Sequence, residues 1–256
     1  MREQSRPDFG NLTIYGRNPV CEALEDPSVA VLRLHLARSN KPSEAIAQLR
    51  QLAANRQIPV CEHSKLELSR ISRNGRQDQG VAADLRCASL QGLEDLLALP
   101  PRRRLIALDR INNPQNLGMA IRAIAASPCD GLLLSREGGN TGISPLVIKA
   151  SAGTLLRTPI YQCPQLAPSL QRLQGAGYSV IALDGTAPES LFTAPLPAHC
   201  IDVLGNETDG VSPAVQAQAD KALCIPMQRD VESLNVAVTA ALVAFHETAG
   251  LLPEKE

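Results

Sequence analysis

Apolar and polar positions alternate along most of the chain with the periods of strands and helices, and the two kinds of element follow one another. In the first part, strands are expected at residues 12–16, 31–36, 58–60 and 80–83, and helices at residues 43–54 and 64–71. A further helix is expected to begin at Asn18-Pro19, because Asn caps helices and Pro tolerates the first helical position. This βαβα pattern is long enough for a small independent domain.

The second part repeats the alternation over a longer stretch. Strands are expected at residues 104–108, 131–134, 158–161, 179–183, 199–204 and 222–225, and helices at residues 116–126, 145–151, 166–174 and 233–248. Such alternation favours a mainly parallel sheet with helices on both faces. Asn116 and Ser233 stand where the N-caps of two of these helices are expected.

A double proline separates the two parts. Pro100-Pro101 follows a short helical stretch, and proline ends helices and suits linkers. The expected division is an N-terminal domain over residues 1–88, a linker over 89–101 and a C-terminal domain over 102–256. The expected fold class is α/β in both domains.

Charge and aromatic content narrow the possible functions. The 256 residues carry a net charge of -1, so a nucleic-acid role would depend on local basic patches. Two candidates are Lys65, Arg70, Arg73 and Arg76, and the run 102–104, which are equally compatible with ordinary solvated surfaces. Only 2% of the residues are aromatic and none is Trp, which counts against binding single strands mainly by stacking.

The seven cysteines are odd in number, and no two of them form a Cys-x-x-Cys pair. This spacing argues against a disulfide framework and a structural zinc site, and no metal is expected. The expected state of these thiols is that of small buried hydrophobes in a reducing cytosol. No signal peptide and no apolar run long enough to span a bilayer are found, so a cytoplasmic protein without membrane contact is expected.

Three short polar segments follow apolar stretches that are expected to be strands. Residues 112–118 read Asn-Asn-Pro-Gln-Asn-Leu-Gly and are followed by Arg122, residues 204–207 read Leu-Gly-Asn-Glu, and residues 233–236 read Ser-Leu-Asn-Val. Ligand sites in open α/β sheets form outside the carboxyl ends of the strands, so the three segments suggest one composite site. Taken singly, each is also compatible with a helix cap, a tight turn or an exposed polar residue. Neither a dinucleotide nor a nucleoside triphosphate motif is found.

Taken in order, the three segments resemble the motifs of the SpoU (TrmH/RlmB-like) family of SPOUT RNA 2′-O-ribose methyltransferases. The run 149–153, Lys-Ala-Ser-Ala-Gly, is similar to a further segment of that family, and the resemblance covers residues 102–250. Residues 12–86 resemble more weakly the substrate-binding domain of the family's 23S rRNA guanosine 2′-O-methyltransferases, through residues 15–20 and 79–81. That domain is similar to ribosomal protein L30e.

The resemblance implies a C-terminal SPOUT α/β trefoil-knot domain and a smaller N-terminal L30e-like α/β domain that binds RNA. It implies a homodimer, no metal, and S-adenosyl-L-methionine as cofactor. The implied cofactor-binding residues are Leu204, Gly205, Ile225 and Leu234, and the implied catalytic residues are Asn116, Arg122, Glu207, Ser233 and Asn235. Arg122 suits positioning and electrostatic stabilisation better than proton abstraction, because a guanidinium is a permanent cation that donates hydrogen bonds and has no lone pair to accept a proton.

Four positions depart from the family pattern. Thr208 and Arg229 stand where the family has glycines beside the cofactor, Ala237 replaces a Ser, and Asp78 replaces a His. A side chain at either glycine position would narrow the cofactor pocket.

The expected function is S-adenosylmethionine-dependent 2′-O-ribose methylation of RNA, with a 23S rRNA guanosine as target. A tRNA ribose methyltransferase is one alternative. The other is a non-catalytic RNA-binding or ribosome-assembly homologue, which Thr208 and Arg229 favour and the intact motif residues oppose.

Overall fold

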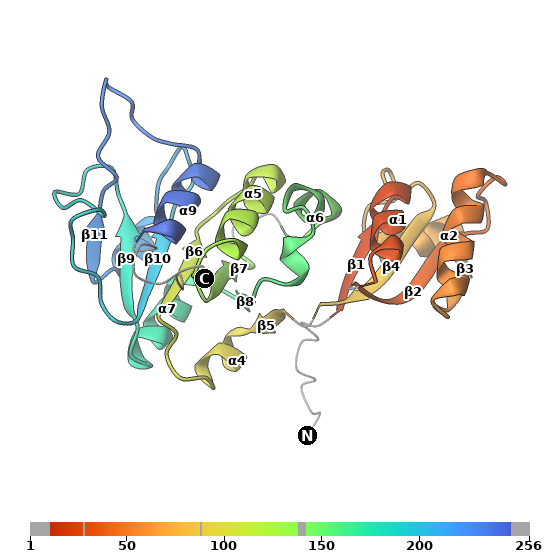
Figure 1. The fold of residues 1–256 in the computed structure, drawn as a ribbon, viewed down its shortest axis with the longest axis horizontal. Coiled ribbons are helices and arrows are strands. Elements are labelled where there is room, and N and C mark those ends of the chain that lie inside the picture. The colour runs from red at the N-terminus through yellow and green to blue at the C-terminus, as the bar shows by residue number, and fades with distance from the viewer. Residues whose placement is uncertain (1–10, 28, 88, 138–141, 247–256) are drawn as a thin grey trace, which may run out of the picture. The chain divides into compact units, whose positions relative to one another are not determined.

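A computed structural model describes residues 11–27, 29–87, 89–137 and 142–246 (Figure 1). The chain divides into two units, residues 1–88 with 143–145 and residues 89–142 with 146–256. Each unit contains one sheet with helices packed on it, so the expected α/β class is confirmed. Among the described residues, no helix is long and apolar enough to cross a membrane.

The sheet of the first unit has four strands in the order β1-β4-β2-β3. Its elements are β1 (Asn11–Tyr15), α1 (Arg17–Glu25), β2 (Ala30–Ala37), α2 (Glu44–Asn55), β3 (Val60–His63), α3 (Lys65–Ser72) and β4 (Val81–Arg86). β4 is antiparallel to β1 and β2, whereas β2 and β3 are parallel. β3 is therefore an edge strand.

Successive residues of β2 face opposite sides of this sheet. Leu34 and Leu36 are buried on one side, and His35 and Ala37 are buried on the other. Helix α3 covers part of the second side, where Leu68 packs with Ala37 and Ala82. His35 thus lies on a sheet face that is only partly covered by apolar side chains.

Helix α1 starts earlier than the sequence predicts. Gly16, with φ of +95°, is at the N-cap and the helix begins at Arg17, so Asn18 lies inside the first turn rather than capping it. The positive φ lets the chain leave β1 and turn at once into the helix, while the Gly16 N–H still donates to the Val81 carbonyl at 2.9 Å. A glycine at the turn, rather than the capping side chain, therefore sets this helix start.

The sheet of the second unit has seven parallel strands in the order β11-β9-β10-β6-β7-β8-β5. The strands are β5 (Leu90–Gly92), β6 (Arg104–Leu108), β7 (Gly131–Ser135), β8 (Ile160–Cys163), β9 (Ser179–Leu183), β10 (Cys200–Leu204) and β11 (Lys221–Leu223). Every residue of β6, β7 and β10 is buried, as expected for parallel strands covered on both faces.

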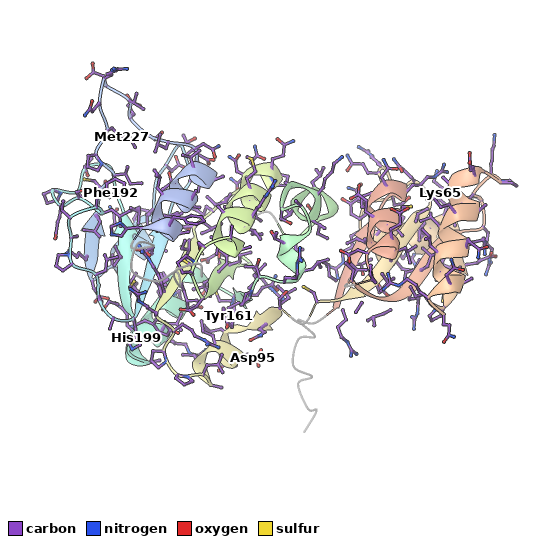
Figure 2. All side chains as sticks on the ribbon, in the orientation of Figure 1. Lys65, Asp95, Tyr161, Phe192, His199 and Met227 are labelled. Atoms are coloured by element: carbon purple, nitrogen blue, oxygen red, sulfur yellow. The ribbon has the colours of Figure 1, made fainter. Side chains whose placement is uncertain are left out.

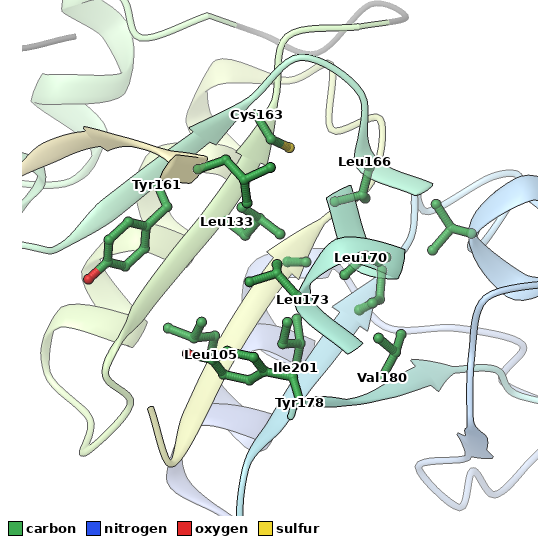
Figure 3. Packing of buried hydrophobic residues seen from close by; sticks show 14 of the residues in the cluster. Leu105, Leu133, Tyr161, Cys163, Leu166, Leu170, Leu173, Tyr178, Val180 and Ile201 are labelled. Carbon is green, nitrogen blue, oxygen red and sulfur yellow. The ribbon is translucent and has the colours of Figure 1, made fainter. Parts of the chain in front are cut away.

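Helices cover both faces of this sheet. They are α4 (Leu93–Leu97), α5 (Pro114–Ala125), α6 (Pro145–Ala150), a 3₁₀ helix (Thr154–Leu156), α7 (Leu166–Gly175), α8 (Pro213–Gln216) and α9 (Val236–Phe245). Figure 3 shows Leu166, Leu170 and Leu173 of α7 packed over the central strands. Helices α5 and α9 pack against each other and contact the sheet at β7 and β10 (Figure 1).

Residues 89–101 are not a free linker, which corrects the sequence prediction. Residues 90–92 form β5, which pairs in parallel with β8, and the Ile160 N–H donates to the Ser89 carbonyl at 2.7 Å. Leu93 and Leu96 of α4 are buried in the core of the second unit. This segment belongs to the second unit because its apolar residues bury there, and Pro100-Pro101 merely joins α4 to β6.

We predict that Leu96→Ala lowers the free energy of unfolding by about 2–5 kcal/mol, because it leaves a cavity in the core of the second unit. Leu99→Ala, at a residue that is 36% exposed, is the matched control and should change it by less than about 1 kcal/mol. Urea unfolding of the full chain measures both values. Equal effects of the two substitutions would contradict the packing of α4 described here.

Candidate active site

The sheet of the second unit reverses its direction of winding at β6. β7, the next strand in the chain, lies on one side of β6, and β10 lies on the other. At such a switch point the loops at the carboxyl ends of the two strands diverge and leave a crevice. Leu108 and Leu204 are the last paired residues, so the loops after them begin side by side.

A cavity of about 280 Å³ lies on the β10 side of this crevice. It is bordered by the loops after β9, β10 and β11 and by the start of α9, through residues 183–185, 204–208, 210, 225, 227, 232–234, 236 and 239. Figure 2 labels one of these residues, Met227, on the long segment between β11 and α9. Leu204, Gly205, Ile225 and Leu234, the predicted cofactor-binding residues, all line this cavity.

Gly205 allows the loop after β10 to fold back on itself. A Cβ at this position would lie 2.0 Å from the carbonyl carbon of Gly210 and 2.2 Å from the Val211 nitrogen. The backbones of Asn206 and Gly210 exchange two hydrogen bonds of 3.1 and 2.8 Å, which close the loop. The absence of a side chain is therefore a steric requirement of this loop.

Asp109 ties the loop after β6 to the loop after β10. Its carboxylate accepts a 2.6 Å hydrogen bond from the Ser212 N–H, and its own N–H donates to the Leu204 carbonyl at 2.9 Å. Nearby, the Asn206 side chain donates to the Arg110 carbonyl at 3.2 Å. Asp109 is 3% exposed and was not among the predicted site residues, because it lies just before the first of the three polar segments.

Asn116 does not cap α5, which corrects the sequence prediction. Asn113 caps α5, accepting from the Gln115 N–H at 2.8 Å, and Pro114 takes the first helical position. The Asn116 side chain is thereby left available for other partners. Its amide nitrogen donates to the Glu207 carboxylate, and its amide oxygen accepts from the Asn235 side chain at 3.1 Å.

Asn235 caps α9, whereas the cap was predicted at Ser233. The Asn235 side-chain oxygen accepts from the Ala237 N–H at 2.9 Å, and its nitrogen is the donor to Asn116. Ser233 lies two residues before the cap and lines the cavity, as Glu207 does. The expected helix over residues 233–248 thus begins at Val236, and its last two residues lie outside the described part of the chain.

Arg122 is not joined to the other predicted catalytic residues. It lies six residues after Asn116 on α5, about 9 Å farther along the helix axis. Its side chain is exposed and does not line the cavity. Within the described residues, its guanidinium has no ion-pair or hydrogen-bond partner, so it is available to an external anion.

The cavity carries acidic but no basic side chains among its described lining residues. Asp184, Glu207 and Glu232 contribute carboxylates. The Thr186 N–H and hydroxyl each donate to Asp184 at 2.8 Å, and these hydrogen bonds lower the pKa of Asp184, led by the backbone bond. This environment suits a cationic ligand and disfavours a polyphosphate. Asp184 was not among the predicted site residues, because it follows β9 and lies in none of the three polar segments.

Residues that depart from the family pattern differ in their relation to the cavity. Thr208 lines it, and its N–H donates to the Asn206 side chain at 2.8 Å. Arg229 does not line it, but adopts a left-handed backbone with φ of 58°, as does Asp230 with 56°. Ala237 contributes its backbone N–H to the cap of α9, a role that needs no hydroxyl.

The run 149–153 supports the helix that carries Asn116. A Cβ at Gly118 of α5 would lie 2.4 Å from the Ala150 Cβ, so α5 and α6 meet where neither has a large side chain. Ser151 is fully buried and bonds locally, donating to the Ile148 carbonyl at 2.8 Å. The segment thus has a packing role.

We predict that Gly205→Ala destabilises the protein by about 2–4 kcal/mol, because the added methyl group overlaps the backbone of residues 210–211. Gly175→Ala is the matched control: a Cβ there meets nothing within 4 Å, and alanine favours the end of helix α7. Thermal unfolding of the two variants checks this. A Gly205→Ala protein as stable as the control would show that the loop does not need this close approach.

Comparison with known proteins agrees with this geometry. A model of the SpoU rRNA Methylase family matches residues 103–245, and a model of an RNA 2′-O ribose methyltransferase substrate-binding domain matches residues 13–89. An uncharacterized tRNA/rRNA methyltransferase of Mycolicibacterium vanbaalenii is 31% identical over 236 residues, which cover 90% of this chain and 74% of that protein.

Solved structures share the fold. An AdoMet-bound rRNA methyltransferase from Sinorhizobium meliloti aligns with a TM-score of 0.63 at 22% identity, covering 95% of this chain and 88% of that one. The SpoU methyltransferase AviRb from Streptomyces viridochromogenes, in complex with AdoMet, aligns with a TM-score of 0.65 at 21% identity, covering 97% and 93%. Because the family model spans more than half of the sequence and close relatives match over most of it, the chain belongs to the SpoU family of RNA methyltransferases.

Proposed function

We propose that this protein transfers a methyl group from S-adenosyl-L-methionine to a ribose 2′-hydroxyl of RNA, with a 23S rRNA guanosine as target. The observation that carries the cofactor assignment is the cavity at the switch point, which has three carboxylates and no basic residue in its described lining. The bound cofactor would supply a methyl group on a positively charged sulfonium, a charge that suits these carboxylates. S-adenosylmethionine is reported in two structures of the same fold.

Backbone and apolar groups would hold the cofactor. Leu204 and Gly205 offer the carboxyl end of β10, and Ile225 and Leu234 line the cavity from the segment between β11 and α9. With no side chain at Gly205, a ligand can approach the backbone closely. Thr208 is exposed at the edge of the cavity, which is compatible with cofactor binding despite the family's glycine there.

Asn116, Glu207 and Asn235 would position the target ribose. The Asn116 amide is held between the Glu207 carboxylate and the Asn235 side chain, so its orientation is fixed before substrate binds. Fixed polar groups cost no reorganisation during reaction. Ser233, at the cavity wall next to this network, is the fourth residue of the positioning set.

Arg122 would bind the phosphate beside the target ribose. A guanidinium presents a planar fork of donors that matches phosphate oxygens. Held beside the 2′-hydroxyl, its positive charge favours loss of the hydroxyl proton as the oxygen attacks the methyl carbon in line. Its exposure and its lack of a described partner leave it available for this role.

The first unit would bind the RNA substrate, as part of a domain over residues 1–88. The two segments that resemble the family's substrate-binding domain meet in space: the Arg17 N–H donates to the Gln79 side chain at 3.1 Å. Asp78, which stands where the family has a His, is buried. Its carboxylate accepts hydrogen bonds from the Ser72 hydroxyl at 2.9 Å and from the Gly80 N–H at 3.0 Å. Asp78 thus supports the turn between these segments.

The proposal includes a homodimer and the trefoil knot that the family resemblance implies. Val238, Leu242 and Phe245 are exposed by 49, 36 and 41% and recur along α9 with the spacing of one helix face. Met119 on the adjacent helix α5 is 44% exposed. An apolar surface of this kind supports a protein interface here, and its position beside Asn235 would place the active site near the partner subunit.

We predict that Arg122→Ala lowers the rate of methyl transfer about 100-fold or more while cofactor binding is retained, because the residue acts on substrate outside the cavity. The assay follows labelled methyl from S-adenosylmethionine into unmodified 23S rRNA and, separately, bulk tRNA, with calorimetry of the cofactor. Arg172→Ala is the matched control, since Arg172 is an exposed arginine of α7 that forms an ion pair with Glu94 of α4.

The outcomes separate the alternatives. Labelled methyl groups in 23S rRNA that are lost with Arg122→Ala would support the proposal. Labelled methyl groups in tRNA alone would identify tRNA, rather than 23S rRNA, as the substrate. Failure of both methyl transfer and cofactor binding in the wild-type protein would point to a non-catalytic homologue. A wild-type rate in Arg122→Ala would remove this residue from the mechanism.

We predict that Val238→Glu converts a dimer into monomers, because burying an unpaired carboxylate in an apolar interface is costly. Leu66→Glu is the control, at a residue of the first unit that is 64% exposed and is not part of α9. Sedimentation velocity of the two variants and the wild type measures the state of association. A monomeric wild-type protein would refute the dimer.

A further inference from the structure

A row of polar side chains crosses one face of the sheet in the first unit. His35 of β2 pairs directly with Cys61 of the parallel edge strand β3, and Ala37 pairs with His63. Cys61 and His63 are two residues apart and therefore point to the same side as His35. The register of two strands thus brings together two imidazoles and a thiol.

The three side chains are close enough to share one ion. His35 Nδ1 and His63 Nε2 lie 2.9 Å apart, and the ligand atoms of His35, Cys61 and His63 all lie within 4.8 Å of one another. Tetrahedral zinc with ordinary bond lengths separates two nitrogen ligands by about 3.3 Å and a nitrogen from a sulfur by about 3.5 Å. Small side-chain rotations would reach these distances without moving either strand.

Asp84 prepares His35 for this role. His35 Nε2 lies 2.9 Å from Asp84 Oδ2, and because a carboxylate only accepts, the imidazole nitrogen must be the donor. In the neutral ring, Nδ1 then carries the lone pair and faces His63. The Thr13 hydroxyl donates to the other Asp84 oxygen at 2.7 Å and fixes the carboxylate. Metal-binding histidines are typically oriented by such a carboxylate.

Burial gives the cluster one closed side and one open side. His35 is 4% exposed, whereas Cys61 and His63 are half-buried on the edge strand. Two imidazoles and a thiolate are ligands that zinc accepts, and three protein ligands leave a fourth position for water or another donor. This set has no local sequence signature, because His35 lies 26 residues before Cys61 and only one cysteine takes part.

We propose that His35, Cys61 and His63 bind one Zn²⁺ ion, with Asp84 as the positioning residue behind His35. The ion would join the edge strand β3 to β2 and hold that edge of the first unit. This site is separate from the cavity in the second unit and does not depend on the proposed methyl transfer. The alternative is that these side chains only form hydrogen bonds with one another and bind no metal.

The test is titration of the reduced full-length protein with Co²⁺, whose thiolate charge-transfer absorption reports a cysteine ligand, followed by displacement with Zn²⁺. The proposal expects one equivalent of Co²⁺ with this band. Cys61→Ser should abolish the band, His63→Gln should weaken binding at least about 10-fold, and Asp84→Asn should weaken it about 10- to 100-fold.

Cys21→Ser is the matched control, because Cys21 is also a half-buried thiol of the first unit but lies on α1. It should leave the band and the affinity unchanged. Thermal unfolding in the absence of metal identifies any variant that fails to fold. Absence of the band in the wild-type protein, or a band that survives in folded Cys61→Ser, would overturn the proposal.

Discussion

The parallel pairing of β6 with β10 is the constraint on which the candidate site depends. It brings Leu108 beside Leu204, so two loops that are far apart in the sequence start from neighbouring positions. A buried ion pair lies between the same two strands, with Arg104 Nε 2.6 Å from Asp202 Oδ2. Losing one partner would leave an uncompensated buried charge, so this pairing tolerates little change. The bridges from Asp109 to Ser212 and from Asn116 to Glu207 both require it.

Two kinds of residue form the candidate site at the ends of these two strands. Gly205 acts by having no side chain, which lets backbone cross backbone, while Asn116 acts through both ends of its amide. The first kind shapes the cavity and the second orders the polar groups beside it. Arg122 belongs to neither group, since it lies on the exposed surface of α5, and this is why the role proposed for it is contact with the substrate.

The sequence predicted the alternating elements and the segments around the cavity, because apolar periodicity and polar strand ends are local signals. It misplaced the starts of α5 and α9: Asn113, which precedes Pro114, caps α5 in place of Asn116, and Asn235 caps α9 in place of Ser233. It also missed β5, a strand of three residues that is defined by its pairing with β8. Asp184 and the cluster around His35 were not predicted for the same reason, because only the folded chain brings their partners together.

The position of β5 also bears on how the second unit can be isolated. β8 has β7 on one side and β5 on the other, so a fragment that started after Pro101 would remove β5 and leave β8 with a row of unpaired backbone groups. Exposed strand edges recruit strands from other molecules and promote aggregation. A fragment starting at Ser89 would keep the protecting strand together with the buried leucines of α4. The short strand ahead of the double proline therefore covers the edge of β8 and leaves only three residues as the edge of the sheet.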